Sequence, residues 1–321
     1  MKAGFTSQIA TILLVVLIYS CNQQNSETSS MQNYVIAYNV LVDSERDNYD
    51  IFIVNPENQQ SINISNNPDV AWTYTSFGNR ITYISDKDTY GRCEFLYQMD
   101  VDGKNDHKIT NFRLRDSWMG FRKNGTEIIV SPHESVDSVF YIINLNGQVI
   151  KKVNTGLPYA VDPTFSPDGK KIAFRGAHKK SKRDKGFIDE IYVINEDGTE
   201  LKKLTEYPKS DTTAKWYSYK AAPPRWHPTE NFISYASFQN GKYSLYGVTP
   251  DGKKKWKLTD NHRSEVYHNW SPDGNWLVMD LSDTEETKYQ IGLMNWKTKE
   301  LMILTDTIYD YQQSPVFVLT E

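Results

Sequence analysis

The feature that constrains this chain most is a short apolar–small–apolar strand motif that recurs six times along its 321 residues. The spacings between successive copies are 45, 47, 44, 61 and 44 residues. The copies are Ile36-Ala37-Tyr38, Ile81-Thr82-Tyr83, Ile128-Ile129-Val130, Ile172-Ala173-Phe174, Ile233-Ser234-Tyr235 and Leu277-Val278-Met279. A period of this length indicates one supersecondary unit repeated along the chain, with each unit packing against its neighbours.

Each copy of the motif is followed by two further strands. The first of these is again apolar, as at residues 96–100, and it leads into a tight polar turn. Four of the turns contain Asp-Gly or Asn-Gly, which tolerate the left-handed backbone that short hairpins need. The last strand of the unit often ends in Leu-Thr or Ile-Thr, at residues 109–110, 204–205, 258–259 and 304–305.

One more strand precedes the motif and is joined to it by a Ser-Pro-Asp-Gly turn. This turn is intact at residues 166–169 and 271–274 and degenerate at 122–125 and 227–230. Proline presets one turn dihedral angle, and glycine adopts the positive φ that the turn requires. Four strands per repeat at this period are typical of a β-propeller blade. We therefore predict an all-β fold, a six-bladed β-propeller of four-stranded antiparallel blades.

The two ends of the repeat array predict how the propeller closes. The array begins on a second strand, residues 34–40, with no inner strand before it. It ends on an inner strand, residues 314–317, with no further strands after it. We predict that the C-terminal strand joins the N-terminal blade, because this pairing closes the ring and covers an otherwise open strand edge.

The N-terminal residues carry the pattern of an export signal. Residues 9–18 form an apolar run behind Lys2 that is too short to span a bilayer but matches a signal-peptide core. The run leads to Ser20-Cys21, a small residue before a cysteine, which resembles a bacterial lipoprotein signal. An ordinary signal peptide or an uncleaved anchor is the alternative. The predicted segments are a lipoprotein signal peptide at 1–20, a lipidated Cys21 with a flexible tether at 21–30, and a single propeller domain at 31–321.

The lipoprotein interpretation implies a location in the cell envelope and leaves Cys93 as an unpaired cysteine. We expect an exported lipoprotein, held through its lipid alone at the periplasmic face of the outer membrane or at the cell surface. Because Cys21 is assigned to the lipid, Cys93 has no partner for an intramolecular disulfide. The net charge of −4 gives no reason to expect nucleic-acid binding. We expect a monomer with no cofactor and no metal.

The Ser-Pro-Asp-Gly repeats resemble the WD40-like (PD40) repeats of TolB-type six-bladed propellers, and the resemblance covers residues 31–321. Related propellers serve as periplasmic scaffolds, as substrate gates of peptidases and as polysaccharide lyases, so the resemblance implies a fold rather than one activity. The sequence shows no counterpart of the N-terminal α/β domain of TolB or of the hydrolase domain of oligopeptidases. We therefore expect neither a role in the TolB envelope complex nor peptidase activity to carry over.

Two long loops, which account for the 61-residue spacing, form the candidate ligand site. They are expected to be neighbours on the face opposite the Ser-Pro-Asp-Gly turns. One loop is basic and includes Lys179 and Lys180, and the other is aromatic and includes Trp216 and Tyr217. Sugar rings stack on aromatic side chains, and carboxylates or sulfates pair with lysine, so the loops favour an anionic glycan. A solvated charged loop is the alternative.

Two hypotheses about function follow. The first is a non-catalytic, membrane-tethered module that binds a protein or glycan through this loop-rich face, with Arg225, His268 and Gln312 as further contacts near the ring axis. The second is a carbohydrate-active enzyme of the lyase type, acting on an acidic polysaccharide through His268, Arg225 and His262. The sequence contains no local metal motif, P-loop, dinucleotide fingerprint or Gly-x-Ser-x-Gly elbow. The binding module is therefore the favoured hypothesis.

Overall fold

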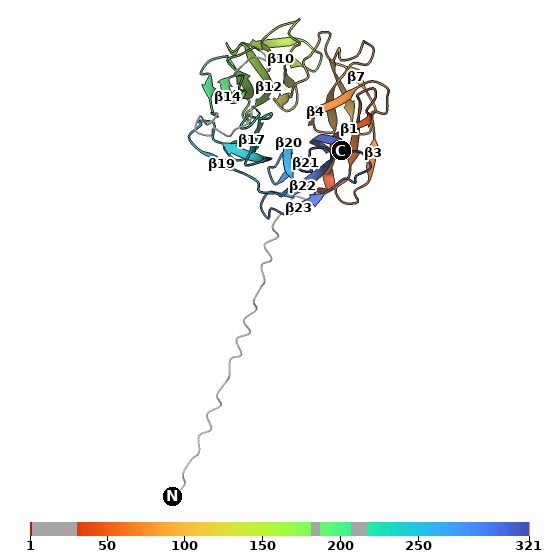
Figure 1. Cartoon of the computed structure of the whole chain (residues 1–321), viewed down its shortest axis with the longest axis vertical. Coiled ribbons are helices and arrows are strands. Elements are labelled where there is room, and N and C mark those ends of the chain that lie inside the picture. Colours follow the sequence, from red (N-terminus) through yellow and green to blue (C-terminus); the bar gives the residue numbers. More distant parts are fainter. Residues whose placement is uncertain (2–30, 181–186, 207–216, 321) are drawn as a thin grey trace. The chain divides into compact units, whose positions relative to one another are not determined.

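A computed structural model of the chain describes Met1 and residues 31–180, 187–206 and 217–320. The chain divides into two units, Met1–Ser30 and Met31–Glu321, and the strands belong to the second unit (Figure 1). The described residues form strands β1 to β24 and one short 3-10 helix, η1 (Met31–Asn33). None of their helices has the length and apolar character needed to cross a membrane.

The strands form six antiparallel sheets of four strands each, and Figure 1 shows these sheets arranged as blades around one axis. The prediction of a six-bladed propeller is confirmed. From the inner to the outer strand, blade 1 consists of β24 (Gln312–Leu319), β1 (Tyr34–Asp43), β2 (Asn48–Val54) and β3 (Ser61–Asn63). Blade 2 consists of β4 (Ala71–Phe77), β5 (Arg80–Ser85), β6 (Phe95–Asp100) and β7 (His107–Lys108). Blade 3 consists of β8 (Gly120–Arg122), β9 (Glu127–Val130), β10 (Phe140–Asn144) and β11 (Val149–Val153). Blade 4 consists of β12 (Tyr159–Phe165), β13 (Lys171–Ala177), β14 (Glu190–Asn195) and β15 (Lys202–Lys203). Blade 5 consists of β16 (Arg225–Trp226), β17 (Ile233–Gln239), β18 (Lys242–Val248) and β19 (Lys255–Lys257). Blade 6 consists of β20 (Ser264–Trp270), β21 (Trp276–Ser282), β22 (Tyr289–Asn295) and β23 (Leu301–Ile303).

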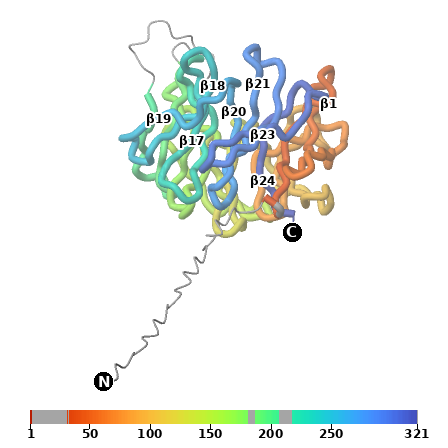
Figure 2. Tube along the Cα trace, turned by 90° about the horizontal axis from the view of Figure 1, so that it is seen from below, coloured from red at the N-terminus to blue at the C-terminus, as the bar shows by residue number. Residues whose placement is uncertain are grey.

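The C-terminal strand β24 closes the ring by pairing with β1, as the sequence predicts. The register places Ile36 opposite Phe317 and Val40 opposite Gln312. Figure 2 shows β24 alongside β1. Blade 1 is therefore built from both ends of the propeller unit.

The hydrophobic core consists of six clusters, one between each pair of neighbouring blades among the described residues. The cluster between blades 1 and 6, for example, joins Tyr38 and Phe317 to Val278 and Leu293. Large aromatic side chains fill the widening space between twisted blades, which explains the high tyrosine, tryptophan and phenylalanine content. The core is thus a ring of interfaces around the axis.

The Ser-Pro-Asp-Gly turn between β12 and β13 shows why its sequence recurs. The Ser166 hydroxyl donates to the Asp168 carboxylate at 2.6 Å and accepts the backbone N–H of Lys171 at 2.9 Å. The backbone N–H of Gly169 donates to the Ser166 carbonyl at 2.8 Å. Gly169 has φ +70°, a conformation that costs glycine little. Ser166, Asp168 and Gly169 therefore each have a defined role in closing the turn.

The Leu-Thr and Ile-Thr endings have an equally local explanation. In four blades the threonine hydroxyl accepts a backbone N–H of the third strand. The pairs are Thr110 with Leu96 at 3.0 Å, Thr205 with Ile191 at 2.9 Å, Thr259 with Leu245 at 3.1 Å and Thr305 with Ile291 at 3.0 Å. The side chain thereby gives a buried backbone N–H an acceptor.

Candidate functional site

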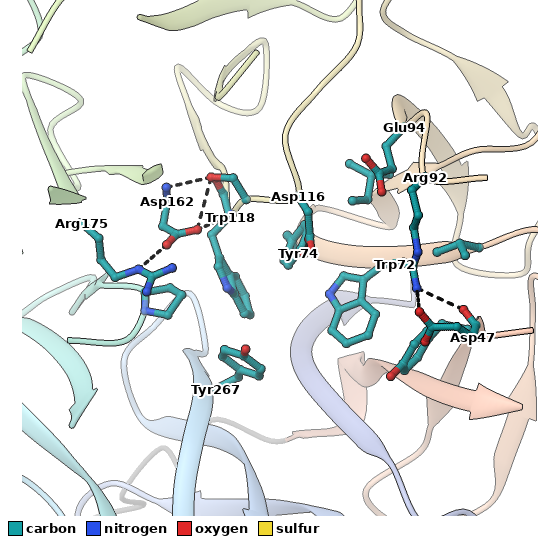
Figure 3. Close-up of a pocket in the computed structure, with 15 residues that line it drawn as sticks. Asp47, Trp72, Tyr74, Arg92, Glu94, Asp116, Trp118, Asp162, Arg175 and Tyr267 are labelled. Carbon is teal, nitrogen blue, oxygen red and sulfur yellow. Dashed lines mark hydrogen bonds and ion pairs between the residues drawn. The ribbon is translucent and has the colours of Figure 1, made fainter. Parts of the chain in front are cut away.

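The six blades surround a pocket of about 430 Å³, which we call the axial pocket (Figure 3). Every blade contributes at least one lining residue, from Asp47 in blade 1 to Tyr267 in blade 6. Most of the lining belongs to the inner strands, to the loops that lead into them, and to the loops between the second and third strands of a blade. The pocket therefore opens on the face opposite the Ser-Pro-Asp-Gly turns.

Five aromatic side chains follow one another along the pocket wall and form what we call the aromatic arc, consisting of Tyr49, Trp72, Tyr74, Trp118 and Tyr267. Successive ring centroids lie 4.6, 6.1, 4.9 and 5.4 Å apart. Trp72 and Tyr74 both lie on β4, and the register of this strand shifts between Thr73 and Thr75, on either side of Tyr74. The arc gives the pocket a rigid wall that can pack against a ligand.

Asp162 holds part of this wall in place. It lies at a bulge in the inner strand β12 with φ +58°, and its carboxylate accepts the backbone N–H of Trp118 at 2.9 Å. The same carboxylate forms an ion pair with Arg175. Arg175 also pairs with Asp189 at 3.0 Å. Asp162 and Asp189 are buried, so the network is protected from water and fixes the Trp118 backbone before any ligand binds.

Two further carboxyl groups lie on the other side of the pocket. Tyr74 donates its hydroxyl hydrogen bond to Asp116, which is solvent-exposed. Glu94 is buried, and burial together with the nearby negative charge of Asp116 raises the pKa of Glu94 to about 7. Asp47 and Arg92 form an ion pair at the rim (Figure 3).

Arg225 and His268 lie on the inner strands β16 and β20, close enough that the Arg225 charge acts on the pKa of His268. Burial, with a smaller contribution from Arg225, lowers the pKa of His268 to about 3, so the imidazole is neutral near pH 7. The His268 Nε2 atom lies 2.7 Å from the Ser234 hydroxyl. The Arg225 guanidinium lies over the Trp118 ring, 3.8 Å from its centroid, and donates to the Pro224 carbonyl at 2.9 Å.

The remaining residues of the two hypotheses lie in other surroundings. His262 is exposed in the loop between β19 and β20. Gln312 is buried at the start of β24, where its side-chain amide donates to the carbonyls of Asp306 and Tyr309 at 2.7 and 3.1 Å. Arg225 and His268 thus lie near each other on neighbouring inner strands, whereas His262 is exposed in a loop and Gln312 bonds to the residues just before it.

The two long loops are described in part. Lys179 and Lys180 are exposed after β13, and the Tyr217 ring packs against Phe238 with centroids 5.0 Å apart. Trp216 and Cys21 lie outside the described residues. Within the described ranges, no three His, Cys, Asp or Glu side chains are grouped so that they could hold a metal ion.

These features define a closed six-bladed propeller with a pocket on its axis. The TolB beta propeller domain family (PD40) matches residues 75–318, most of the chain, and this protein belongs to that family. A Tol-Pal system protein TolB from Francisella tularensis subsp. mediasiatica is 24% identical over 230 residues, covering 68% of this chain and 48% of that protein. The chain spans no more than about half the length of the curated relatives it matches.

Solved structures agree on the fold. TolB from Acinetobacter baumannii superposes with a TM-score of 0.67 at 18% identity, covering 89% of this chain and 67% of that one. A putative TolB from Agrobacterium tumefaciens gives a TM-score of 0.63 at 16% identity, covering 88% of this chain and 91% of the other.

The axial pocket opens on the face where the sequence predicts the two ligand loops, but the pocket itself was not predicted. Trp72 on β4 and Trp118 just before β8 both line the axial pocket. Asp116 and Glu94 were not singled out, because neither belongs to a recognisable motif. Aligning the residues just before each inner strand would have drawn attention to Asp116, Ser117 and Trp118, which enter the pocket together.

Proposed function

We propose that this protein is a non-catalytic binding propeller of the cell envelope that receives part of a partner protein in its axial pocket. The observation that carries the proposal is a pocket to which all six blades contribute and whose wall is fixed by the Asp162 network. Concave sites with aromatic walls and a few positioned polar groups are typical ligand sites. Family membership supports a binding role in general.

Two observations favour a protein partner over an anionic glycan. The pocket lining contains more carboxyl groups than guanidinium groups, which disfavours a polyanion by charge repulsion. The curated relatives are named as components of the Tol-Pal system, which supports an envelope location and a protein partner. The predicted glycan site around Lys179, Lys180 and Trp216 stays a prediction, to be tested with a glycan array and a Trp216→Ala variant.

The surroundings of His268 and His262 disfavour the lyase hypothesis. His268 is buried and neutral and lies within hydrogen-bond distance of Ser234, while His262 is exposed in a separate loop. A general acid or base has to reach the proton that it transfers, and the buried His268, whose Nε2 faces Ser234, is poorly placed to do so.

Site-specific photocrosslinking in cells of the source organism tests the binding role. A photoreactive phenylalanine analogue at Tyr49, in the axial pocket, should form a defined protein adduct on illumination. The same analogue at Phe77, an exposed residue at the Ser-Pro-Asp-Gly turns, serves as the control. Equal adducts at both positions, or none at Tyr49, would argue against binding at the axial pocket.

The lipid anchor has its own test. Metabolic labelling with a fatty acid should label the wild-type protein and leave a Cys21→Ser variant unlabelled. The variant should also move from the membrane fraction to the soluble fraction, because one acylated residue supplies the anchor. A wild-type protein that is exported but not labelled would show that the signal is of the ordinary type.

A further inference from the structure

The axial pocket has an excess of negative charge that its own residues do not neutralise. Two of its carboxylates, Asp47 and Asp162, are paired with Arg92 and Arg175. Two more carboxyl groups, Glu94 and Asp116, lie close enough that the negative charge of Asp116 raises the pKa of Glu94. Arg92 also acts on Glu94, but its guanidinium is already bound to Asp47 at the rim. The side of the pocket around Glu94 and Asp116 therefore favours a positive charge.

The aromatic arc offers ring faces suited to such a charge. Trp118 already has a cation on one face, the Arg225 guanidinium at 3.8 Å from the ring centroid. Among the described lysines and arginines, none lies over the rings of Tyr49, Trp72, Tyr74 or Tyr267. Cations bind over indole and phenol rings because the ring face is electron-rich.

One polar atom in the arc also lacks an acceptor. The indole Nε1 of Trp72 is buried, yet it has no hydrogen-bond partner among the described residues. Figure 3 shows this tryptophan between Tyr74 and the Asp47–Arg92 pair, along the wall of the pocket. An unsatisfied buried donor is unusual in a native structure and needs an acceptor. Because lysine and arginine head groups carry donors only, a backbone carbonyl of the bound segment or a water has to supply that acceptor.

We propose that the axial pocket recognises a lysine or arginine side chain of the partner protein, with its charge between Glu94 and Asp116 and its alkyl stem against the aromatic arc. This inference rests on the proposed function and names the chemistry of the same site. The pocket volume of about 430 Å³ accommodates a long side chain, and the paired network of Asp162 keeps the wall in position.

Proton release provides a signature of this geometry. A cation next to Glu94 stabilises its charged form, so binding near pH 7 should expel a proton from this carboxyl group. The groups that act on Glu94 are Asp116, Arg92 and Asp86. Binding should consequently strengthen as the pH rises from about 6 to about 8, since Glu94 is then already ionised.

The test uses residues 31–321, which form one compact unit, and three capped amino acids as probes. These probes are Nα-acetyl-lysine amide, Nα-acetyl-arginine amide and Nα-acetyl-norleucine amide. Norleucine has the alkyl stem of lysine without the charge. Calorimetric titrations in two buffers of different ionisation enthalpy measure both affinity and proton release. We expect the cationic probes to bind at least about tenfold more tightly than norleucine and to release protons.

Matched variants locate the effect. Asp116→Asn and Glu94→Gln should each weaken the cationic probes by about tenfold, and Glu94→Gln should also abolish proton release. Asp102→Asn removes an equal charge from an exposed turn on the opposite face and should leave binding unchanged. Because Asp116 is exposed, its variant should fold even if the buried Glu94 variant does not.

The outcomes separate this inference from the proposed function. Equal binding of norleucine and lysine, or equal effects of Asp102→Asn and Asp116→Asn, would overturn the cationic side chain as the ligand. A crosslinked partner at Tyr49 that persists unchanged in the Asp116→Asn and Glu94→Gln variants would have the same consequence and leave the binding role intact. If the analogue at Tyr49 gave no adduct in an otherwise wild-type chain, this result would instead contradict the proposed function itself.

Discussion

Some residues recur in the repeats because of a hydrogen bond that they make, and not only because they form an apolar face. The threonine that follows an outer strand accepts a backbone N–H in four blades, as Thr205 does from Ile191. Removing an acceptor from a buried donor costs more than the bond itself contributes, because the donor loses water without gaining a partner. The repeat therefore preserves a hydroxyl at a place where a hydrophobic residue would fit equally well by shape.

A Thr205→Val substitution tests this role. Valine has nearly the same shape, so the expected loss of about 1–3 kcal/mol in unfolding free energy reports the unsatisfied N–H of Ile191. Thr205→Ser keeps the hydroxyl and should recover most of the loss. The measurement is chemical denaturation followed by fluorescence, and a valine variant as stable as wild type would contradict the prediction.

Asp280 is a second single residue with a structural role, because its carboxylate bonds to two inner strands. It is fully buried, and its carboxylate accepts the backbone N–H of Tyr267 at 2.8 Å and that of Ser314 at 3.3 Å. It thereby links the inner strand of blade 6 to the strand that closes the ring. Burial raises the pKa of Asp280 to about 7 despite these bonds, because the charged form loses its hydration.

The pH dependence of stability should reflect this group. The folded state holds a proton that the unfolded chain releases near pH 4, so the Asp280 contribution is fully present below pH 4 and is lost as pH rises to about 7. The total change is at most about 4 kcal/mol. An Asp280→Asn variant should lack this slope relative to wild type. His268, whose pKa is lowered to about 3, gives the opposite slope in both proteins, so parallel curves for the two proteins would contradict the assignment.

At the scale of one element, β24 carries the closure of the propeller. Its residues Val316 and Val318 are buried in the cluster between blades 1 and 2, and Phe317 is buried between blades 1 and 6. One short strand therefore contributes to two blade interfaces and covers the inner edge of β1.

Deletion of residues 314–321 should collapse the fold. Losing three buried side chains alone removes roughly 5 kcal/mol or more of hydrophobic stabilisation, comparable to the whole net stability of a typical domain. We expect aggregation or a large fall in Tm, measured by circular dichroism. A chain lacking only Glu321 is the control. If the long deletion left Tm unchanged, β24 could not be the element that closes the ring.

At the scale of the whole molecule, stability is distributed over six similar interfaces. Each blade contacts both of its neighbours, and the closed ring leaves no terminal blade that could unfold separately. Such a ring should unfold as one cooperative unit, unlike an open repeat array in which end repeats can fray.

An Ile129→Ala substitution tests this cooperativity. Ile129 is fully buried between blades 3 and 4, so its truncation should cost about 2–5 kcal/mol. Tryptophan fluorescence and far-ultraviolet circular dichroism should nevertheless report one shared, lowered transition. Ile150→Ala, at a half-exposed edge position, should change little. Separate transitions for the two probes would indicate that blades unfold independently.

Much of this architecture follows from local sequence. The strand motif, the Ser-Pro-Asp-Gly turn and the Leu-Thr ending act through neighbours in the same blade, so their pattern predicts the blade and its count. Closure by the last strand also follows, because a surplus inner strand and a missing one must match. The Asp162 bulge, by contrast, depends on Trp118 from another blade and leaves no local pattern.

The sequence by itself determined the blade, the number of blades and the pairing of the chain ends, because each depends on short-range turns and strand periodicity. The tertiary structure alone decided which side chains meet on the axis. Glu94, Asp116 and Tyr267 come from three blades and are far apart in sequence, yet the ring brings them to one pocket. No periodicity encodes that meeting, since it results from the angle at which six separately encoded blades pack.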